Sequence, residues 1–585
     1  MLYFYKIYCV LGQGIKMEQG TTKSTKAGLK RRNILSLLEN KTCSYEDRIA
    51  LGIKDDFGWR EFTYKGLGLL SRKLARYLIE ELNLEKGSRA AILSESKPEY
   101  GACVFASVLA GLTSVPLDIK LTKYELESIL SDAKPETIFV SAKYLETAKH
   151  LQSVITTIKH IVVIDEYFED KNVINLYELP NVYTAKWRIR APKSTAFIIY
   201  TSGTTGAPKG VEISYKNITS QLEDLDKVLA LILPNDSVKT LSILPMNHLF
   251  EMTVGFSTFL NFGFSVYYTK SLKPKDILGI MKERQIEFMI VVPAFLKLLK
   301  AAIENEIRNS SAKERAAFKT LYHAAKFIPC YCIKKLLFRK IHEKFGGKFI
   351  GFLSGGAPLD IHVARFFERL GFKVFQGYGL SETSPVVSVN VDKRSALSSV
   401  GRPLSQYEVR IDKETGELQL KGPSVMKGYH NRPDLTAEVI EPDGWLHTGD
   451  VAKQDKDGHI YITGRIKNMI VLSGGKKVFP EEVEMVLEKS EYIAEVCVLG
   501  ETKTFGAKDG TEEVAAVIVP KEELYEKYTD AEIEKMIKDD VKLLSQQLTQ
   551  YKRPNNIVIR KEPLERTTTR KVKRKEVQKI LSAVK

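Results

Sequence analysis

The chain has 585 residues, of which 44% are hydrophobic and 27% charged, ordinary proportions for a folded globular protein. This composition excludes a mostly disordered chain, and the length excludes a single compact core, because chains beyond about 250–300 residues usually divide into domains. Lysines and arginines number 88 against 72 aspartates and glutamates, which gives a net charge of +16. Nucleic acid, a membrane surface and a polyanionic substrate are therefore the partner classes to weigh.

The N-terminal residues contain an apolar run that Lys6 interrupts and Gln13 follows, which does not fit a secretory signal. Met17 opens a polar stretch, so we expect residues 1–30 to be a leader that is either disordered or a misassigned start. Elsewhere no apolar stretch reaches the roughly 18–20 residues that a membrane-spanning helix needs. Six scattered cysteines favour a reducing compartment, and we predict a cytoplasmic protein.

From about Arg48 to Phe375, short apolar runs alternate with longer segments of helical spacing. Runs such as Phe288–Val292 are apolar throughout, as expected of strands covered on both faces. This alternation predicts an α/β architecture with parallel-rich sheets flanked by helices. The expected strands are residues 89–93, 137–140, 160–164, 195–200, 241–244, 266–268, 288–292, 349–353 and 374–375, with helices at 122–132 and 294–307.

After Ser398 the pattern changes to turn-rich, alternating pieces, which predict an antiparallel β subdomain with strands at 407–411, 417–420 and 459–462. From Gly464 the chain is charged, with helices expected at 480–489 and 530–547 and strands at 495–499 and 513–519. We therefore predict a large N-terminal domain, residues 31–465, and a small α+β C-terminal domain, residues 466–585.

One segment that follows a predicted strand combines hydroxyls, glycines and a lysine: Tyr200-Thr-Ser-Gly-Thr-Thr-Gly-Ala-Pro-Lys-Gly210. Amides and hydroxyls in such a loop can surround phosphate oxygens, and Lys209 adds a cation. It is not a Walker A loop, because it lacks the Gly-Lys-Ser/Thr ending. A plain surface loop is the alternative. The eleven residues resemble the phosphate-loop signature of the adenylate-forming superfamily, which includes acyl-CoA synthetases, luciferases and peptide-synthetase adenylation domains.

Further segments match this superfamily in order, from about Asp47 to Leu581, and the resemblance implies their roles. Pro245-Met-Asn-His248 is similar to an element near the acyl pocket, and Ser354-Gly-Gly-Ala-Pro-Leu359 to one that approaches the base. Gly377-Tyr-Gly-Leu-Ser-Glu-Thr383 resembles the adenine-binding segment. The implied nucleotide-binding residues are Thr201, Ser202, Gly203, Thr204, Thr205, Gly206, Lys209, Gly355, Gly356, Ala357, Tyr378, Gly379 and Thr383, with Glu382 and Thr201 as ligands of Mg²⁺ and His248 as a catalytic residue.

The last matching segments lie around the expected domain boundary and in the tail. Asp443-Gly-Trp-Leu-His-Thr-Gly-Asp450 is similar to the segment whose final carboxylate, Asp450, accepts hydrogen bonds from both ribose hydroxyls. Arg465 matches an arginine on the ribose or phosphate, and Lys467 a catalytic residue at the hinge of a mobile C-terminal domain. Gly474 and Gly475 match a loop beside the thiol tunnel. Lys571 matches the catalytic lysine of adenylation, although Arg570 stands where the superfamily has glycine.

The resemblance implies activation of a carboxylic acid with ATP and Mg²⁺ to an acyl-adenylate, release of pyrophosphate, and transfer of the acyl group to coenzyme A. The His248-to-Glu251 spacing and the basic residues before Ser354 resemble the long-chain branch, so a long-chain fatty acid is the expected substrate. A fatty-acyl-AMP or acyl-carrier-protein ligase, with another acceptor, is the alternative. A catalytically silent relative and a nucleic-acid-binding protein are the remaining possibilities, and the latter lacks a binding motif.

The positive charge is concentrated in two places. Residues 326–348 hold seven lysines and arginines against one glutamate, and residues 560–585 hold ten against three. The second group surrounds Lys571, where polyphosphate chemistry is expected. The first interleaves apolar residues, as an interfacial segment does, and predicts peripheral contact with an anionic membrane; a solvated helix packed on the core is the alternative. Neither group indicates nucleic acid.

Overall fold

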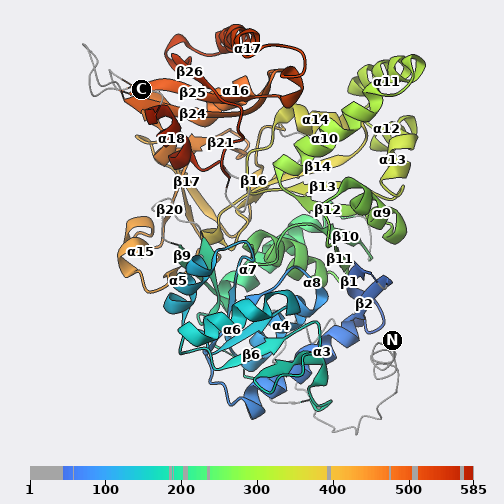
Figure 1. Cartoon of the computed structure of the whole chain (residues 1–585), viewed down its shortest axis with the longest axis vertical. Helices are drawn as coiled ribbons and strands as arrows, with labels where there is room; N and C mark the ends of the chain where they lie inside the picture. The colour runs from blue at the N-terminus through green and yellow to red at the C-terminus, as the bar shows by residue number, and fades with distance from the viewer. Residues whose placement is uncertain are drawn as a thin grey trace.

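In the computed structural model of the chain, residues 44–583 are described apart from 57, 184–186, 189, 202–207, 234–236, 392–396, 473–475, 503–511 and 567–571. The described residues form two large mixed sheets, a four-stranded antiparallel sheet and C-terminal elements that lie at one end of the long axis (Figure 1). The predicted α/β class with parallel-rich sheets is confirmed. The expected leader, residues 1–30, lies outside the described residues.

The eight-stranded sheet has the order β19-β9-β8-β4-β3-β5-β6-β7, and its pairs are parallel except for β8–β9 and β9–β19. Its outer face packs against α5 (Lys123–Ala133) and α6 (Leu145–Val154). The strands are β3 (Arg89–Leu93), β4 (Thr113–Pro116), β5 (Thr137–Val140), β6 (His160–Val163), β7 (Val173–Asn175), β8 (Thr195–Thr201), β9 (Lys209–Ser214) and β19 (Gly428–Tyr429).

The nine-stranded sheet has the order β16-β15-β14-β13-β12-β10-β11-β1-β2, parallel from β14 to β1 and antiparallel at both edges. The strands are β1 (Ile49–Asp55), β2 (Gly58–Thr63), β10 (Lys239–Ser242), β11 (Ser265–Tyr268), β12 (Phe288–Val291), β13 (Gly351–Ser354), β14 (Lys373–Tyr378), β15 (Ser388–Val389) and β16 (Arg402–Pro403).

The sequence of β12 is apolar throughout because both of its faces are covered. Phe288 and Ile290 join the core between the two large sheets, whereas Met289 and Val291 join the core on the other side. That outer core is closed by a group of helices, α9 (Pro274–Arg284), α10 (Pro293–Arg308), α11 (Ala312–Ala324), α12 (Tyr331–Leu337), α13 (Arg339–Lys344) and α14 (Ile361–Arg369).

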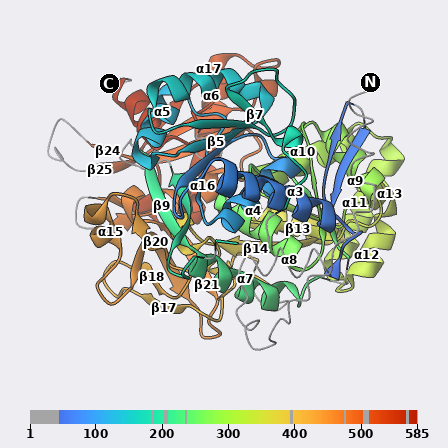
Figure 2. The same ribbon diagram turned by 90° about the horizontal axis from the view of Figure 1, so that it is seen from below.

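Helix α4 (Pro98–Ala110) lies between the two large sheets, and all of its residues are buried (Figure 2). Apart from Glu99 and Ser107 its sequence is apolar, as expected of a helix with no solvent-facing stripe. Pro98 stands in the first turn and Gly111 ends the helix at a left-handed φ of 70°. The same layer holds α3 (Tyr64–Arg76), α7 (Tyr215–Leu229), α8 (Phe259–Asn261) and the π-helices η1 (Tyr77–Glu81) and η4 (Glu251–Thr258).

The antiparallel subdomain predicted after Ser398 is the four-stranded sheet, with the order β17-β18-β20-β21. Its last strand ends at Arg465, and the short helix η7 (Ile466–Asn468) follows. A domain boundary at residue 466 stays a prediction. The strands are β17 (Glu408–Ile411), β18 (Glu417–Lys421), β20 (Leu446–Gln454) and β21 (Ile460–Arg465), and α15 (Pro433–Val439) lies beside them.

The C-terminal elements surround a separate core built on a three-stranded sheet, β24-β25-β26, with a two-stranded ribbon beside it. An ion pair of 2.6 Å joins Lys297 of α10 to Glu488, just after α16. The elements are β22 (Ile470–Val471), β23 (Lys477–Val478), α16 (Pro480–Leu487), β24 (Ile493–Thr502), β25 (Glu512–Pro520), α17 (Asp530–Leu544), β26 (Asn556–Ile559) and α18 (Arg574–Ala583). Within the described residues, no helix is long and apolar enough to cross a bilayer.

The packing of α4 gives a prediction about Gly101, whose Cβ, if present, would lie 2.7 Å from the Phe256 ring. Because Phe256 is fully buried, the ring has nowhere to move, and we expect Gly101→Ala to lower the free energy of unfolding by about 1–3 kcal/mol in urea denaturation. The control is Gly279→Ala on α9, where a Cβ meets nothing within 4 Å. That change should stabilise by about 0.5–1 kcal/mol; equal effects of the two would contradict the packing argument.

Candidate active site

The loops that follow β10, β13 and β14 come from one parallel stretch of the nine-stranded sheet, so they meet at its carboxyl edge. His248 follows β10, the segment Gly355–Ala357 follows β13, and Tyr378 ends β14. Phe250 lies so close to Gly355 that a Cβ there would be 2.9 Å from its ring. The structure therefore brings three of the predicted segments to one edge, where His248 is partly exposed and Ala357 is exposed.

Asp450 is the buried centre of the predicted sugar-binding group. Its Oδ2 accepts a hydrogen bond of 2.7 Å from the Tyr378 hydroxyl, and its Oδ1 lies 2.8 Å from Arg465 Nε. Asp450 and Arg465 face each other in the β20–β21 pair. Burial and the neighbouring carboxylate raise the pKa of Tyr378, so its hydroxyl stays a donor. Three residues that the sequence predicted separately thus form one contact chain.

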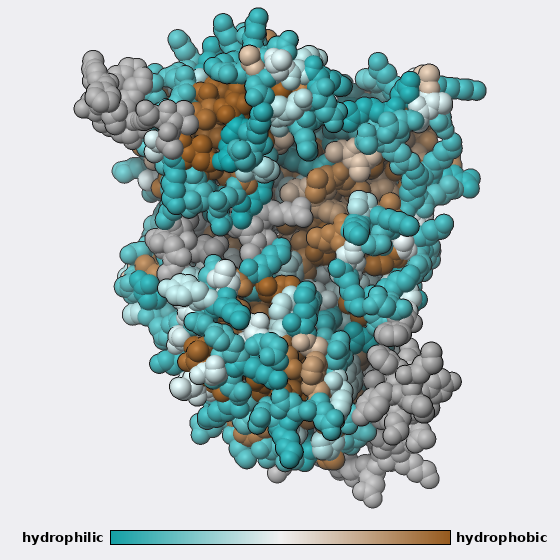
Figure 3. Space-filling model, in the orientation of Figure 1, coloured by the Kyte–Doolittle hydropathy of each residue, from teal (hydrophilic) through white to brown (hydrophobic). Residues whose placement is uncertain are grey.

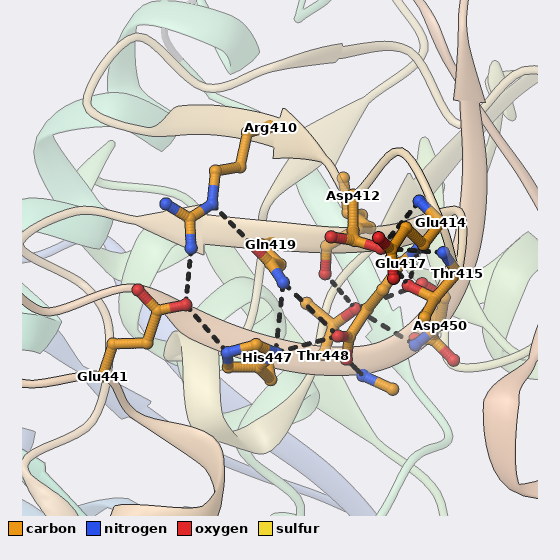
Figure 4. Close-up of polar contacts among 12 residues, drawn as sticks. Arg410, Asp412, Glu414, Thr415, Glu417, Gln419, Glu441, His447, Thr448 and Asp450 are labelled. Atoms are coloured by element: carbon orange, nitrogen blue, oxygen red, sulfur yellow. Dashed lines mark hydrogen bonds and ion pairs between the residues drawn. The ribbon is translucent and has the colours of Figure 1, made fainter.

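The strand segment that carries Asp450 is fixed by Glu417 of β18 (Figure 4). Glu417 Oε1 accepts a hydrogen bond of 2.8 Å from the Gly449 amide, and Oε2 lies 2.8 Å from His447 Nδ1. His447 Nε2 lies 2.9 Å from Glu441. Although burial opposes the charged ring, the two glutamates raise the pKa of His447. This network was not predicted from the sequence, because Glu417 lies in another strand.

A second contact chain runs from Lys209, at the start of β9, to Glu382. Lys209 Nζ lies 5.3 Å from the centre of the Tyr429 ring, and the Tyr429 hydroxyl donates a 2.9 Å hydrogen bond to Glu382 Oε1. Tyr429 was missed in the sequence; its place follows from the pairing of β19 with β9, which brings it opposite Val211. Thr201 pairs with Lys209 in the β8–β9 ladder, so the described end of the phosphate loop adjoins this chain.

The remaining predicted residues are placed as follows. Thr383 is buried, and its hydroxyl bonds within its own turn, to the carbonyls of Leu380 and Pro385. Gly379 has room for no side chain, since a Cβ would lie 1.7 Å from the Pro385 carbonyl oxygen. Gly356 has a left-handed φ of 82°, and Lys467 is exposed in η7. Outside the described residues lie Ser202, Gly203, Thr204, Thr205, Gly206, Gly474, Gly475 and Lys571.

Glu251, three residues after His248, is fully buried at the start of the π-helix η4. Its carboxyl oxygens make no well-formed hydrogen bond among the described residues, and the effect of the Ser242 hydroxyl is smaller than that of burial. Burial raises its pKa to about 8, so the group is a neutral acid at pH 7. In the sequence, Glu251 entered only through its spacing from His248, and its burial follows from the structure.

Two family models match the chain. One, described as AMP-binding enzyme, covers residues 38–430, and the other, described as AMP-binding enzyme C-terminal domain, covers residues 467–583. The chain belongs to the AMP-binding enzyme family, which confirms the resemblance to adenylate-forming enzymes. The first match ends at residue 430 and the second begins at residue 467, so the domain boundary expected at residue 466 stays a prediction.

Individual relatives share about a quarter to a third of their residues with this chain. The chain is 28% identical to the long-chain-fatty-acid–CoA ligase of Salmonella typhimurium over 513 residues, 80% of this chain and 83% of that one. It is 32% identical to a chloroplastic long-chain-fatty-acid–[acyl-carrier-protein] ligase of Arabidopsis thaliana over 389 residues, 56% of this chain and 51% of that one. Among solved structures, the o-succinylbenzoate coenzyme A synthetase of Bacillus subtilis with ATP and magnesium ion has a TM-score of 0.71 at 24% identity, covering 93% and 99%. That likeness concerns the fold.

The buried acid gives a pH-dependent prediction for Glu251→Gln. A carboxyl whose pKa is near 8 when folded and about 4.3 when unfolded costs stability as the pH rises between these values, because only the unfolded chain ionises. Glutamine does not titrate, so the variant should gain about 3–5 kcal/mol relative to the native chain between pH 4.5 and 8 in urea unfolding. Any constant cost of its amide cancels in that difference.

The control for this experiment is Met252→Leu, at the next buried position, which changes no titratable group. Its stability difference from the native chain should be the same at both pH values. If the stability difference between Glu251→Gln and the native chain is also the same at both pH values, Glu251 is not a neutral acid in the folded protein.

Proposed function

We propose that the protein activates a long-chain fatty acid with ATP to an acyl-adenylate, releasing pyrophosphate, and then transfers the acyl group to the thiol of coenzyme A. The observation that carries this proposal is the buried Asp450 carboxylate held by Tyr378 and Arg465. A carboxylate has about four acceptor sites, so two remain for a pair of sugar hydroxyls. Tyr378, beside it at the end of β14, supplies a flat ring for the base.

The residues near Glu382 fit a magnesium ion. Mg²⁺ prefers carboxylate and hydroxyl oxygens, which Glu382 and Thr201 supply, and it usually keeps several waters and substrate phosphate oxygens as its other ligands. The hydrogen bond from Tyr429 fixes the direction of the Glu382 carboxylate. When bound, the ion would offset part of the polyphosphate charge.

The protein's task in the first step is to hold the fatty carboxylate in line with the α-phosphorus while negative charge accumulates there. A carboxylate oxygen forms a bond to phosphorus and pyrophosphate leaves, so no protein nucleophile is needed. Lys209 and Lys571 are the cations proposed to oppose that charge. The resemblance also assigns Thr383 to the α-phosphate, although its buried hydroxyl bonds within its own turn in this structure. In the second step the thiol attacks the acyl carbonyl and AMP leaves. The resemblance assigns Gly474 and Gly475, which lie outside the described residues, to the binding of that thiol.

An apolar acyl group is supported by the activity for which the relative from Salmonella typhimurium is named and by the surface of this protein. Apolar residues gather in the hollow between the C-terminal elements and the large domain, over α10 and β14 (Figure 3). This places apolar surface beside the strand that ends at Tyr378. The phenylalanines of residues 256–264 give no such support, since Phe256 and Phe259 are fully buried in the core.

The acceptor has one specific rival. The relative from Arabidopsis thaliana is named for transfer to acyl-carrier protein, and it has the higher identity, although over a shorter stretch. The alternative function is therefore acyl-carrier-protein or fatty-acyl-AMP ligase chemistry, which keeps the adenylation step and changes the thiol.

A pyrophosphate-release assay tests the activity. Protein, ATP, Mg²⁺ and single fatty acids of increasing length should release pyrophosphate, and coenzyme A should raise the steady rate by removing the adenylate. If acyl-carrier protein accelerates the release and coenzyme A does not, the acceptor is the carrier protein. No release with any acid would refute the proposal.

Lysine 571 provides a test of the two half-reactions. Lys571→Ala should lower pyrophosphate release by about a hundredfold or more, because it removes a cation that opposes charge in the transition state. It should leave thioester formation from synthetic acyl-AMP nearly unchanged. The matched control is Lys573→Ala, an exposed neighbour whose Nζ lies 3.7 Å from Glu565, and it should affect neither step. Equal loss of both half-reactions in Lys571→Ala would contradict the assigned role.

A further inference from the structure

Helix α12 packs Leu337 against the outer core, but it turns two other large apolar residues outward and a lysine inward. Ile333 and Leu336, neighbours on one helix face, are 50% and 70% exposed. Lys334 between them is buried, and its Nζ lies 5.3 Å from the centre of the Tyr331 ring. Burial lowers the pKa of Lys334. Phe327, just before this helix, is 80% exposed. Folding in water does not favour this orientation, so the exposed apolar residues indicate a contact that the isolated chain does not make.

Basic side chains lie close to these apolar residues along the chain. Lys326 is exposed, Lys335 is partly exposed, and the side chains of Arg339 and Lys340 are 75% and 89% exposed. Arg339 pairs with Glu343 at 2.7 Å and Lys340 with Glu314 at 3.6 Å, but such exposed pairs contribute little and leave the cations accessible. We call Lys326, Phe327, Ile333, Lys335, Leu336, Arg339 and Lys340 the basic–apolar patch.

We propose that the basic–apolar patch docks on the surface of an anionic lipid bilayer. Large apolar side chains would enter the boundary between headgroups and acyl chains, while the lysines and arginine contact lipid phosphates. Helices α11, α12 and α13 lie at the side of the molecule, away from α15 and the four-stranded sheet (Figure 1). This contact goes beyond the proposed reaction and does not depend on it.

Two other occupants of the patch are disfavoured by charge. A second copy would bring residues 326–348, with seven lysines and arginines against one glutamate, onto the same surface of its partner. Residues 1–43 carry eight lysines and arginines against two glutamates, so they have the same sign as the patch. An anionic bilayer is the occupant that neutralises this charge and also accepts Phe327 and Leu336.

Vesicle co-sedimentation of the full chain, without ATP or fatty acid, tests the proposal. The protein should bind vesicles of phosphatidylcholine with phosphatidylglycerol, much less those of phosphatidylcholine alone, and binding should fall as salt rises. Replacing Lys326, Lys335, Arg339 and Lys340 by glutamine should lower binding about tenfold or more. The control replaces the exposed Lys171, Lys193, Lys413 and Lys456, an equal change in net charge, and should lower it by about twofold at most.

The apolar contribution is tested with a second pair of variants. Phe327→Ser with Leu336→Ser should weaken vesicle binding about tenfold. Tyr124→Ser with Leu231→Ser, at residues that are 79% and 76% exposed elsewhere, should not. Sedimentation equilibrium of each variant in the absence of lipid reports its oligomeric state.

Three outcomes would overturn the proposal. If the patch variants bind vesicles as well as the native chain does, this surface is not the docking site. If the control variants lose as much vesicle binding as the patch variants, the effect is due to net charge alone. The patch would instead be a dimer interface if the native chain is a dimer that binds no vesicles and the Phe327→Ser, Leu336→Ser variant is a monomer. A loss of pyrophosphate release with vesicle binding intact would bear on the reaction and leave the membrane contact standing.

Discussion

The burial of α4 between the two large sheets is the constraint on which the site depends. Every residue of that helix is buried, and it contacts β1 on one side and β3 and β4 on the other. It therefore fixes the separation of the sheets. Because the phosphate loop follows a strand of one sheet and Tyr378 ends a strand of the other, this spacing decides whether Lys209 and Glu382 can share the ring and hydroxyl of Tyr429.

Local sequence predicted the buried parallel strands closely. The strands 89–93 and 137–140 match β3 and β5 at both ends, because apolar runs between polar turns identify strands covered on both faces. The strand expected at 241–244 lies two residues earlier, since Lys239 and Thr240 pair with β11 despite their polarity. β1, β2 and β4 were not predicted; β1 carries Lys54 and Asp55 at an end near the edge of the sheet, and β4 is only four residues long and ends in proline.

For the site, motif resemblance identified residues and long-range pairing explains their geometry. Tyr378, Asp450 and Arg465 were recognised one by one, but their contact depends on β20 pairing with β21 beside the end of β14. Tyr429 and Glu417 have no local signal, because each acts through a partner at least thirty residues away. The Glu417 carboxylate holds both a backbone amide and His447, so it orients the segment from two points.

The ion pair between Lys297 and Glu488 has a further consequence. Its two side chains are 41% and 38% exposed, and such a pair stabilises by only about 0–1 kcal/mol, at most about twice the thermal energy. Water and dissolved salt can replace either partner at little cost. This ion pair therefore contributes little to holding the C-terminal elements against α10. A ligand that binds one placement of those elements with a modest preference would contribute more.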